Sequence, residues 1–150
     1  FSVEIDAYYV WEPHIQNGVK LLSKDKTIIF DEPENTYTWQ MNLFAEQSYI
    51  DSNKKNLVQL LKALIETEKF VLDNKQQSVV IVAEHTKIST DTLNDIWSKF
   101  EFKVDLRSDL VDIIQENLVW ANNRREVKSE KLPNSANLID ESIFASSKDQ

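Results

Sequence analysis

The residues best suited to ligand chemistry gather in one short segment, residues 5–14. It holds the aromatic side chains Tyr8, Tyr9 and Trp11 and the carboxylates of Asp6 and Glu12. Aromatic rings supply apolar walls and stacking faces, and polar tips orient a ligand. Aromatic residues are more often buried in a core. A binding cleft and a structural core therefore both remain interpretations of this segment.

The sequence contains few residues that could form a metal site or a catalytic nucleophile. His14 and His85 are the only histidines, and there is no Cys. Neither His has the neighbours that would complete the three or four ligands of a zinc site. The acidic residues of segment 31–35 are interrupted by a proline, which favours a solvated turn over a calcium loop. The single glycine, Gly18, excludes glycine-rich phosphate loops and the GxSxG nucleophile elbow. A Ser-His-Asp triad is a spatial arrangement that a sequence does not reveal. We predict no metal, no cofactor, no catalytic residue and no enzyme activity.

Composition limits the partners. The 150 residues, with 41% apolar and 28% charged, predict one globular domain, residues 1–150. A net charge of −8 argues against nucleic acid and anionic membrane surfaces as partners. The longest apolar run, residues 79–83, is too short to span a membrane. The chain starts at Phe1 without Met or signal peptide, so we expect a processed chain or an excised piece.

Hydrophobic periodicity predicts the elements that must position these residues. Alternation and β-branched content predict strands, and apolar spacing of three and four predicts helices. We expect caps at Asp51 or Ser52, at Ser89 and at Ser108, and a left-handed Asn74. The expected strands are residues 3–7, 27–30 and 36–44, the expected helices 13–23, 52–73, 89–100 and 108–121, with a short element at 138–144 and an exposed loop at 128–137.

One motif resembles a known family. Asp6-Ala7-x-x-x-Trp11-Glu12-Pro13 resembles the D-A-x-x-x-W-(D/E)-P segment of type 2 periplasmic substrate-binding proteins, notably the sulfonate, taurine and nitrate binders and the thiamine-pyrimidine-precursor binders. Residues 54–74 resemble a long family helix, and residues 110–122 and 133–144 resemble its closing stretch. The family's first half is absent. The resemblance implies an α/β fold, a partial type 2 periplasmic-binding-protein-like fold that is helix-rich with a small, mostly parallel sheet. It also implies a helix at residues 76–86, where β-branched residues alone favour a strand.

The resemblance implies a function. The chain would be a lobe that captures a small anionic or heteroaromatic solute for an ABC-type importer. The alternative is an extracytoplasmic ligand-sensing domain of a membrane-anchored signalling protein. A helical interaction module without a ligand is the plainest reading. The implied location is periplasmic or extracellular and membrane-associated, in a bacterium. The implied partners are a permease or signalling domain, the missing N-terminal half, and a second copy covering the exposed apolar face.

Position selects the candidate site. In open α/β sheets, ligands bind where strands end and helices begin. We therefore predict ligand contacts from Tyr8, Trp11 and Glu12, with Trp39 and Gln40 in second place. Asp6 is predicted to be structural, hydrogen-bonded to the backbone near the hinge between the lobes.

Overall fold

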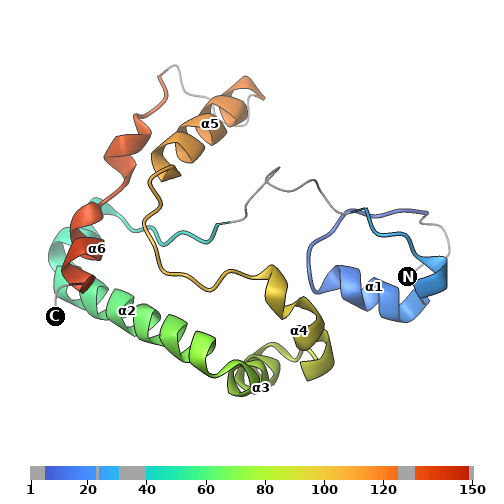
Figure 1. Ribbon diagram of the computed structural model, residues 1–150. Helices are drawn as coiled ribbons and strands as arrows, with labels where there is room; N and C mark the ends of the chain where they lie inside the picture. The colour runs from blue at the N-terminus through green and yellow to red at the C-terminus, as the bar shows by residue number, and fades with distance from the viewer. Residues whose placement is uncertain (1–5, 23, 31–39, 125–130, 149–150) are drawn as a thin grey trace. The chain divides into compact units, whose positions relative to one another are not determined.

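The computed structural model of the chain describes residues 6–22, 24–30, 40–124 and 131–148 (Figure 1). Within these residues all regular structure is helical. The α-helices are α1 (His14–Leu22), α2 (Gln47–Asp73), α3 (Lys75–Thr86), α4 (Thr90–Ile96), α5 (Leu110–Asn123) and α6 (Glu141–Lys148), and the 3₁₀ turns are η1 (Lys24–Lys26), η2 (Trp97–Lys99) and η3 (Ser135–Leu138).

The predicted α/β fold is wrong, because the described part of the chain contains no strand and no sheet. Ala7, residues 27–30 and residues 40–44 are irregular, while residues 1–5 and 31–39 lie outside the described residues. Ile28 and Phe30 are 80% and 88% exposed. β-branched residues favour a strand only when a neighbouring strand packs and pairs with them, and no such neighbour is described here.

The predicted helices are confirmed, with changes at their ends. α1 ends at Leu22, as expected from its spacing. α2 starts before the predicted residue 52 and joins two helical pieces at Asn53, whose φ is −126° and ψ 18°. The predicted cap at Asp51 or Ser52 is wrong. The Ser52 hydroxyl donates to the Ser48 carbonyl inside the helix at 2.8 Å.

The segment of residues 76–86 is helical, as the resemblance implied, and not a strand. Asn74 precedes it with φ −132°, so the predicted left-handed conformation there is wrong. The left-handed residue is Lys87, with φ 63°, whose N–H donates to the carbonyl of Ala83 at 2.9 Å. This bond closes the end of α3.

The C-terminal predictions hold in part. α5 matches the helix predicted at residues 108–121. The short element predicted at residues 138–144 is α6, which starts later, at Glu141. Of the loop predicted at residues 128–137, residues 131–134 are irregular and Ser135 begins η3, while residues 128–130 lie outside the described residues.

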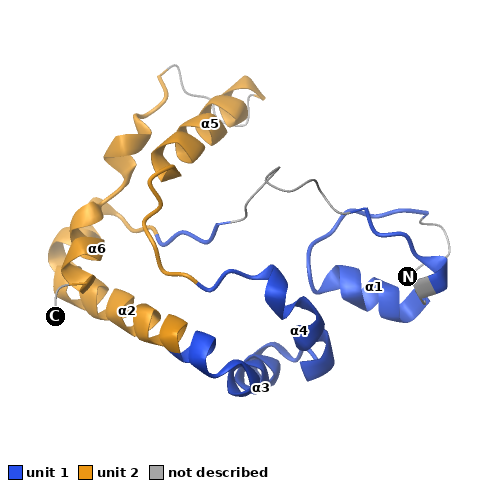
Figure 2. Cartoon of the chain, viewed as in Figure 1, with its two compact units in different colours: residues 1–43, 70–102 blue, residues 44–69, 103–150 orange. Residues whose placement is uncertain are grey.

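The chain divides into two compact units (Figure 2). Unit 1 comprises residues 1–43 and 70–102, and unit 2 comprises residues 44–69 and 103–150. The boundary between them passes through the last turns of α2. The single domain predicted from chain length stays a prediction.

Unit 1 has a small apolar core where α3 meets α4 and η2. Its buried members are Val79, Leu93, Ile96 and Trp97, between 1% and 9% exposed. The Ser89 hydroxyl accepts the N–H of Thr92 at 3.2 Å and caps α4, as predicted. The half-buried residues packed against this core are Val71, Val82, Ala83, Ile88 and Phe102.

Polar contacts attach α1 to α4 in unit 1. The ammonium of Lys20 lies 3.2 Å from the Asp95 carboxylate and donates to the Thr92 hydroxyl at 2.8 Å. On α1, the Tyr8 hydroxyl occupies the space over Gly18, where a Cβ atom would collide with it. This close approach accounts for a glycine inside a helix.

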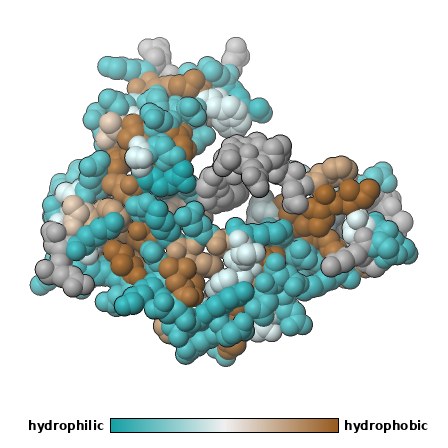
Figure 3. Space-filling view, viewed as in Figure 1, coloured by the Kyte–Doolittle hydropathy of each residue, from teal (hydrophilic) through white to brown (hydrophobic). Residues whose placement is uncertain are grey.

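Polar contacts join separate segments of unit 2. The Lys54 ammonium donates to the Ser142 hydroxyl at 3.1 Å and so ties α2 to α6. The Glu68 carboxylate accepts the Val104 N–H at 2.7 Å. Ile143 is the one apolar residue of this unit that is buried among the described residues. On the face shown in Figure 3, hydrophobic side chains form separate patches.

The adjacent residues Val79 and Val80 provide a matched test of the unit 1 core, because they are 1% and 48% exposed on the same helix. We expect Val79→Ala to lower the free energy of unfolding by about 2 kcal/mol. Val80→Ala should change it by less than about 0.5 kcal/mol. Urea denaturation measures both, and equal losses would contradict this packing.

Candidate functional site

Trp11 and His14 lie at the start of α1 with their rings edge to face, 6.3 Å apart at an interplanar angle of 75°. Trp11 is 62% exposed. Its indole therefore offers a surface to solvent, and the ligand contact predicted for Trp11 stays a prediction. Tyr8 is 43% exposed and packs over Gly18, so part of its role is structural.

Glu12 is committed to the fold of unit 1. One carboxylate oxygen lies 2.6 Å from the Lys99 ammonium, and the other accepts the N–H of Gln16 at 3.2 Å. Its side chain is only 9% exposed. A carboxylate here complements the positive end of the α1 dipole. The helix end at which an anionic solute was expected thus already holds an anionic group of the chain itself.

Of the two second-rank predicted residues, the structure describes Gln40 alone. Trp39 lies outside the described residues. Gln40 is half-buried, and its Nε2 is buried without a hydrogen-bond partner among the described residues. Asp6 is exposed and makes no hydrogen bond within the described ranges. The structure therefore gathers Tyr8, Trp11 and Glu12 around the start of α1.

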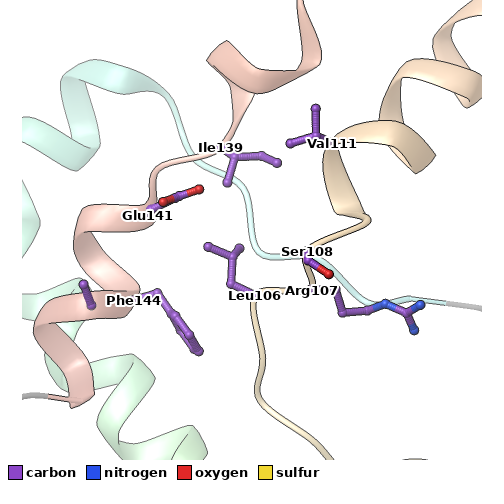
Figure 4. A pocket seen from close by; sticks show the side chains of 8 residues that line it. Leu106, Arg107, Ser108, Val111, Ile139, Glu141 and Phe144 are labelled. Carbon is purple, nitrogen blue, oxygen red and sulfur yellow. The ribbon is translucent and has the colours of Figure 1, made fainter.

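A pocket of about 280 Å³ opens in unit 2, and we refer to it as the unit 2 pocket (Figure 4). It lies between the chain that leads into α5 and the start of α6. Its walls are mainly apolar, with one hydroxyl, one guanidinium and one carboxylate. The lining residues are Leu106, Arg107, Ser108, Val111, Ile139, Glu141, Phe144 and Ala145.

The charged groups of the unit 2 pocket are not equivalent. Arg107 binds Asp109 through two bonds, Nε to Oδ1 at 2.8 Å and Nη2 to Oδ2 at 2.6 Å. The Arg107 hydrogen bond holds the pKa of Asp109 below its usual value. In Figure 4 the guanidinium points away from Leu106 and from α6. Glu141 makes no ion pair with any described residue. The pocket therefore favours neutral or basic groups.

The N-terminal ends of α5 and α6 both lie at the unit 2 pocket, and they are capped differently. The predicted cap Ser108 is wrong, because Asp109 holds the cap position of α5. Asp109 makes no side-chain capping bond, since its carboxylate is bound to Arg107. At α6 the Asp140 carboxylate accepts the N–H of Ser142 at 2.9 Å and its hydroxyl at 2.6 Å. Asp140 thereby fixes the turn that presents Glu141 and Phe144.

Two other kinds of feature were looked for in the described residues, a metal cluster and a membrane-spanning helix. Among the described residues, no group of three or more His, Asp or Glu side chains is placed to hold a metal ion. In the same part of the chain, no helix is long and apolar enough to cross a membrane.

Sequence reasoning missed both Lys99 and the unit 2 pocket. Lys99 stands 87 residues from Glu12, and no local pattern links them. The pocket residues come from two separate segments, each with an ordinary apolar pattern. One signal was present. Leu106 and Arg107 end a strict alternation of charged and apolar residues that starts at Glu101.

Comparison of the chain with protein-family models, with curated proteins and with solved structures finds no match. The resemblance to periplasmic substrate-binding proteins therefore rests on the residues quoted for it.

A double-mutant cycle tests the structural role of Glu12. We expect Glu12→Gln and Lys99→Met each to destabilise the protein. Their coupling energy should be about 0.5–1 kcal/mol, because Lys99 is 43% exposed and solvent screens the pair. Chemical denaturation of the four proteins measures it. Strictly additive losses would show that the ion pair does not hold α1.

The cap of α6 predicts a pH dependence. Hydrogen bonds from Ser142 lower the pKa of Asp140 below its usual 3.8. The charged form stabilises the fold, so its contribution is present above the usual pKa and is lost as the pH falls through the folded pKa. We expect Asp140→Ala to cost about 0.5–1 kcal/mol at neutral pH, because the cap is solvent-exposed.

The gap between Asp140→Ala and the parent should close in acid. Urea denaturation at neutral pH and at stepwise lower pH measures it. Ser146→Ala removes a hydroxyl that donates to the Ser142 carbonyl and contacts no carboxylate, so it serves as the control and should show no such convergence. A gap that stays constant down to strongly acidic pH would contradict the capping role.

Proposed function

We propose that this chain is a binding module for a small, neutral or basic heteroaromatic molecule, held in the unit 2 pocket. The observation that carries the proposal is the pocket itself, whose lining combines apolar side chains with one hydroxyl, one guanidinium and one carboxylate. Ligand sites are concave and mainly apolar, with a few polar groups that fix orientation. Its volume of about 280 Å³ is near the lower end of the usual range and suits a single-ring ligand.

The charges favour a heteroaromatic solute over an anionic one. Glu12 already fills the N-terminal end of α1. In the unit 2 pocket, Arg107 is bound to Asp109, while Glu141 remains to face a ligand. The net charge of −8 adds a field that repels anions. Phe144 and Leu106 supply apolar surface for a ring.

Delivery of this solute to a membrane importer is the wider role we propose, with ligand sensing as the alternative. Both rest on the likeness of residues 6–13 to the substrate-binding family. The sheet that those proteins use to frame their cleft plays no part in the proposal.

Calorimetric titration with two probes of equal ring size tests the proposal. We expect 4-aminopyrimidine to bind, because it is a flat heteroaromatic base whose amino group can donate a hydrogen bond to the Glu141 carboxylate. Benzenesulfonate should not bind, because its charge has the sign of Glu141. Glu141→Gln should weaken 4-aminopyrimidine binding about tenfold, since a charge-assisted hydrogen bond is lost.

Filling the pocket provides the control for location. Val111→Phe adds a ring to the pocket wall and should abolish binding. Val119→Phe makes the same change on α5 at a residue that is 43% exposed and outside the pocket lining, and should leave binding intact. Tighter binding of benzenesulfonate, or equal effects of the two Val variants, would contradict the proposal.

A further inference from the structure

Groups that attract anions meet at one end of the unit 2 pocket. Arg107 carries a guanidinium and Ser108 carries a hydroxyl, and both residues line the pocket. α5 begins at Leu110, so the positive end of its dipole lies close to them along the chain. A guanidinium beside a helix N-terminus is a combination that binds carboxylate, sulfonate or phosphate groups. The preference of this pocket for neutral or basic groups therefore needs a cause.

The carboxylate of Asp109 supplies that cause. It binds the Arg107 guanidinium through two hydrogen bonds, at 2.8 and 2.6 Å. Asp109 holds the cap position of α5, where an Asp side chain usually accepts an N–H of the first turn, yet it caps none. The hydrogen bond from Arg107 lowers the pKa of Asp109, so this carboxylate keeps its charge at neutral pH. Its side chain serves Arg107 in place of the helix.

We propose that Asp109 is a positioning residue that sets the charge selectivity of the unit 2 pocket by holding the Arg107 guanidinium away from the ligand. Asp109 is not one of the lining residues, so it acts through Arg107. The guanidinium points away from Leu106 and from α6 in Figure 4, which leaves Glu141 as the charged group that a ligand meets. This inference rests on the proposed function, because it concerns the same pocket.

Loss of the Asp109 carboxylate gives the Arg107 guanidinium two other anions to bind. It can pair with Glu141 and neutralise it, or it can bind an anionic ligand in the pocket. Both outcomes weaken the preference for basic groups, and the second creates affinity for anions. The side chains of Arg107 and Asp109 are 40% and 46% exposed, and exposed ion pairs are weak. We therefore expect a change in affinity of about tenfold and not of several hundredfold.

Calorimetric titration of Asp109→Asn with benzenesulfonate and with 4-aminopyrimidine tests this role. Asn is as good a cap residue as Asp, so α5 should keep its start. We expect the variant to bind benzenesulfonate about tenfold more tightly than the parent does. It should bind 4-aminopyrimidine more weakly than the parent does. A merely structural role of Asp109 would not move the two affinities in opposite directions.

Asp112→Asn is the matched control for charge. Asp112 is exposed in the first turn of α5, lies outside the pocket lining and forms no ion pair with the residues that the structure describes. Its replacement removes the same single negative charge from the chain as Asp109→Asn does. A gain in benzenesulfonate affinity that came from the overall field would therefore appear in both variants.

Two double variants locate the gain. R107Q/D109N lacks the guanidinium and should bind benzenesulfonate no better than the parent. D109N/V111F fills the pocket with a ring and should not bind it either. A gain that survives in one of these variants would overturn the inference, because the anion would then bind without Arg107 or outside the pocket.

The results distinguish this inference from the proposed function. A parent that does not bind 4-aminopyrimidine contradicts the proposed function, and the gain of benzenesulfonate binding in Asp109→Asn is still measured. That gain, absent from Asp112→Asn and dependent on Arg107, supports the inference in either case. No gain in Asp109→Asn, or an equal gain in Asp112→Asn, would show that Asp109 does not set the selectivity, even where the parent binds 4-aminopyrimidine as proposed.

Discussion

The contact between Val79 on α3 and the Ile96–Trp97 corner is the constraint on which unit 1 depends. It buries the few side chains that are almost fully excluded from water in this unit. The same corner begins η2 and so places Lys99 within 2.6 Å of Glu12. That ion pair fixes the start of α1, where the exposed indole of Trp11 is presented. The aromatic segment that first suggested ligand chemistry is therefore positioned by a core formed by residues 79–97, far from it in sequence.

Unit 2 has less buried apolar surface than unit 1 and is joined by polar bonds. Ile143 is its one buried apolar residue among the described residues, and polar bonds from Lys54, Glu68 and Asp140 join its parts. Apolar walls that are not filled by neighbouring side chains leave a cavity. The unit 2 pocket follows from this incomplete packing. Its preference for neutral or basic groups follows because Arg107 binds Asp109 and not Glu141.

Local patterns predicted the helices better than the sheet or the site. The helix predicted at residues 52–73 and the Ser89 cap are properties of a few neighbouring residues, and both appear, although no residue of α2 is buried. The strand at residues 27–30 required a partner that composition does not reveal. The β-branched run of α3 became helical, as the family resemblance had implied, with Val79 buried and Val80 exposed. The unit 2 pocket forms where residues 106–111 and 139–145 come together, and no sequence pattern in either segment predicts contact with the other.

The most direct test of the central claim is a heteronuclear NMR titration of the full chain with 4-aminopyrimidine. Backbone amide shifts report the location of a ligand residue by residue, without any mutation. The account predicts that shifts change along residues 106–111 and 139–145 and leave residues 8–14 unaffected. Shift changes confined to Trp11 and its neighbours would contradict it, because they would place ligand binding in unit 1. If a large excess of 4-aminopyrimidine changes no backbone shift, the unit 2 pocket does not bind this class of molecule.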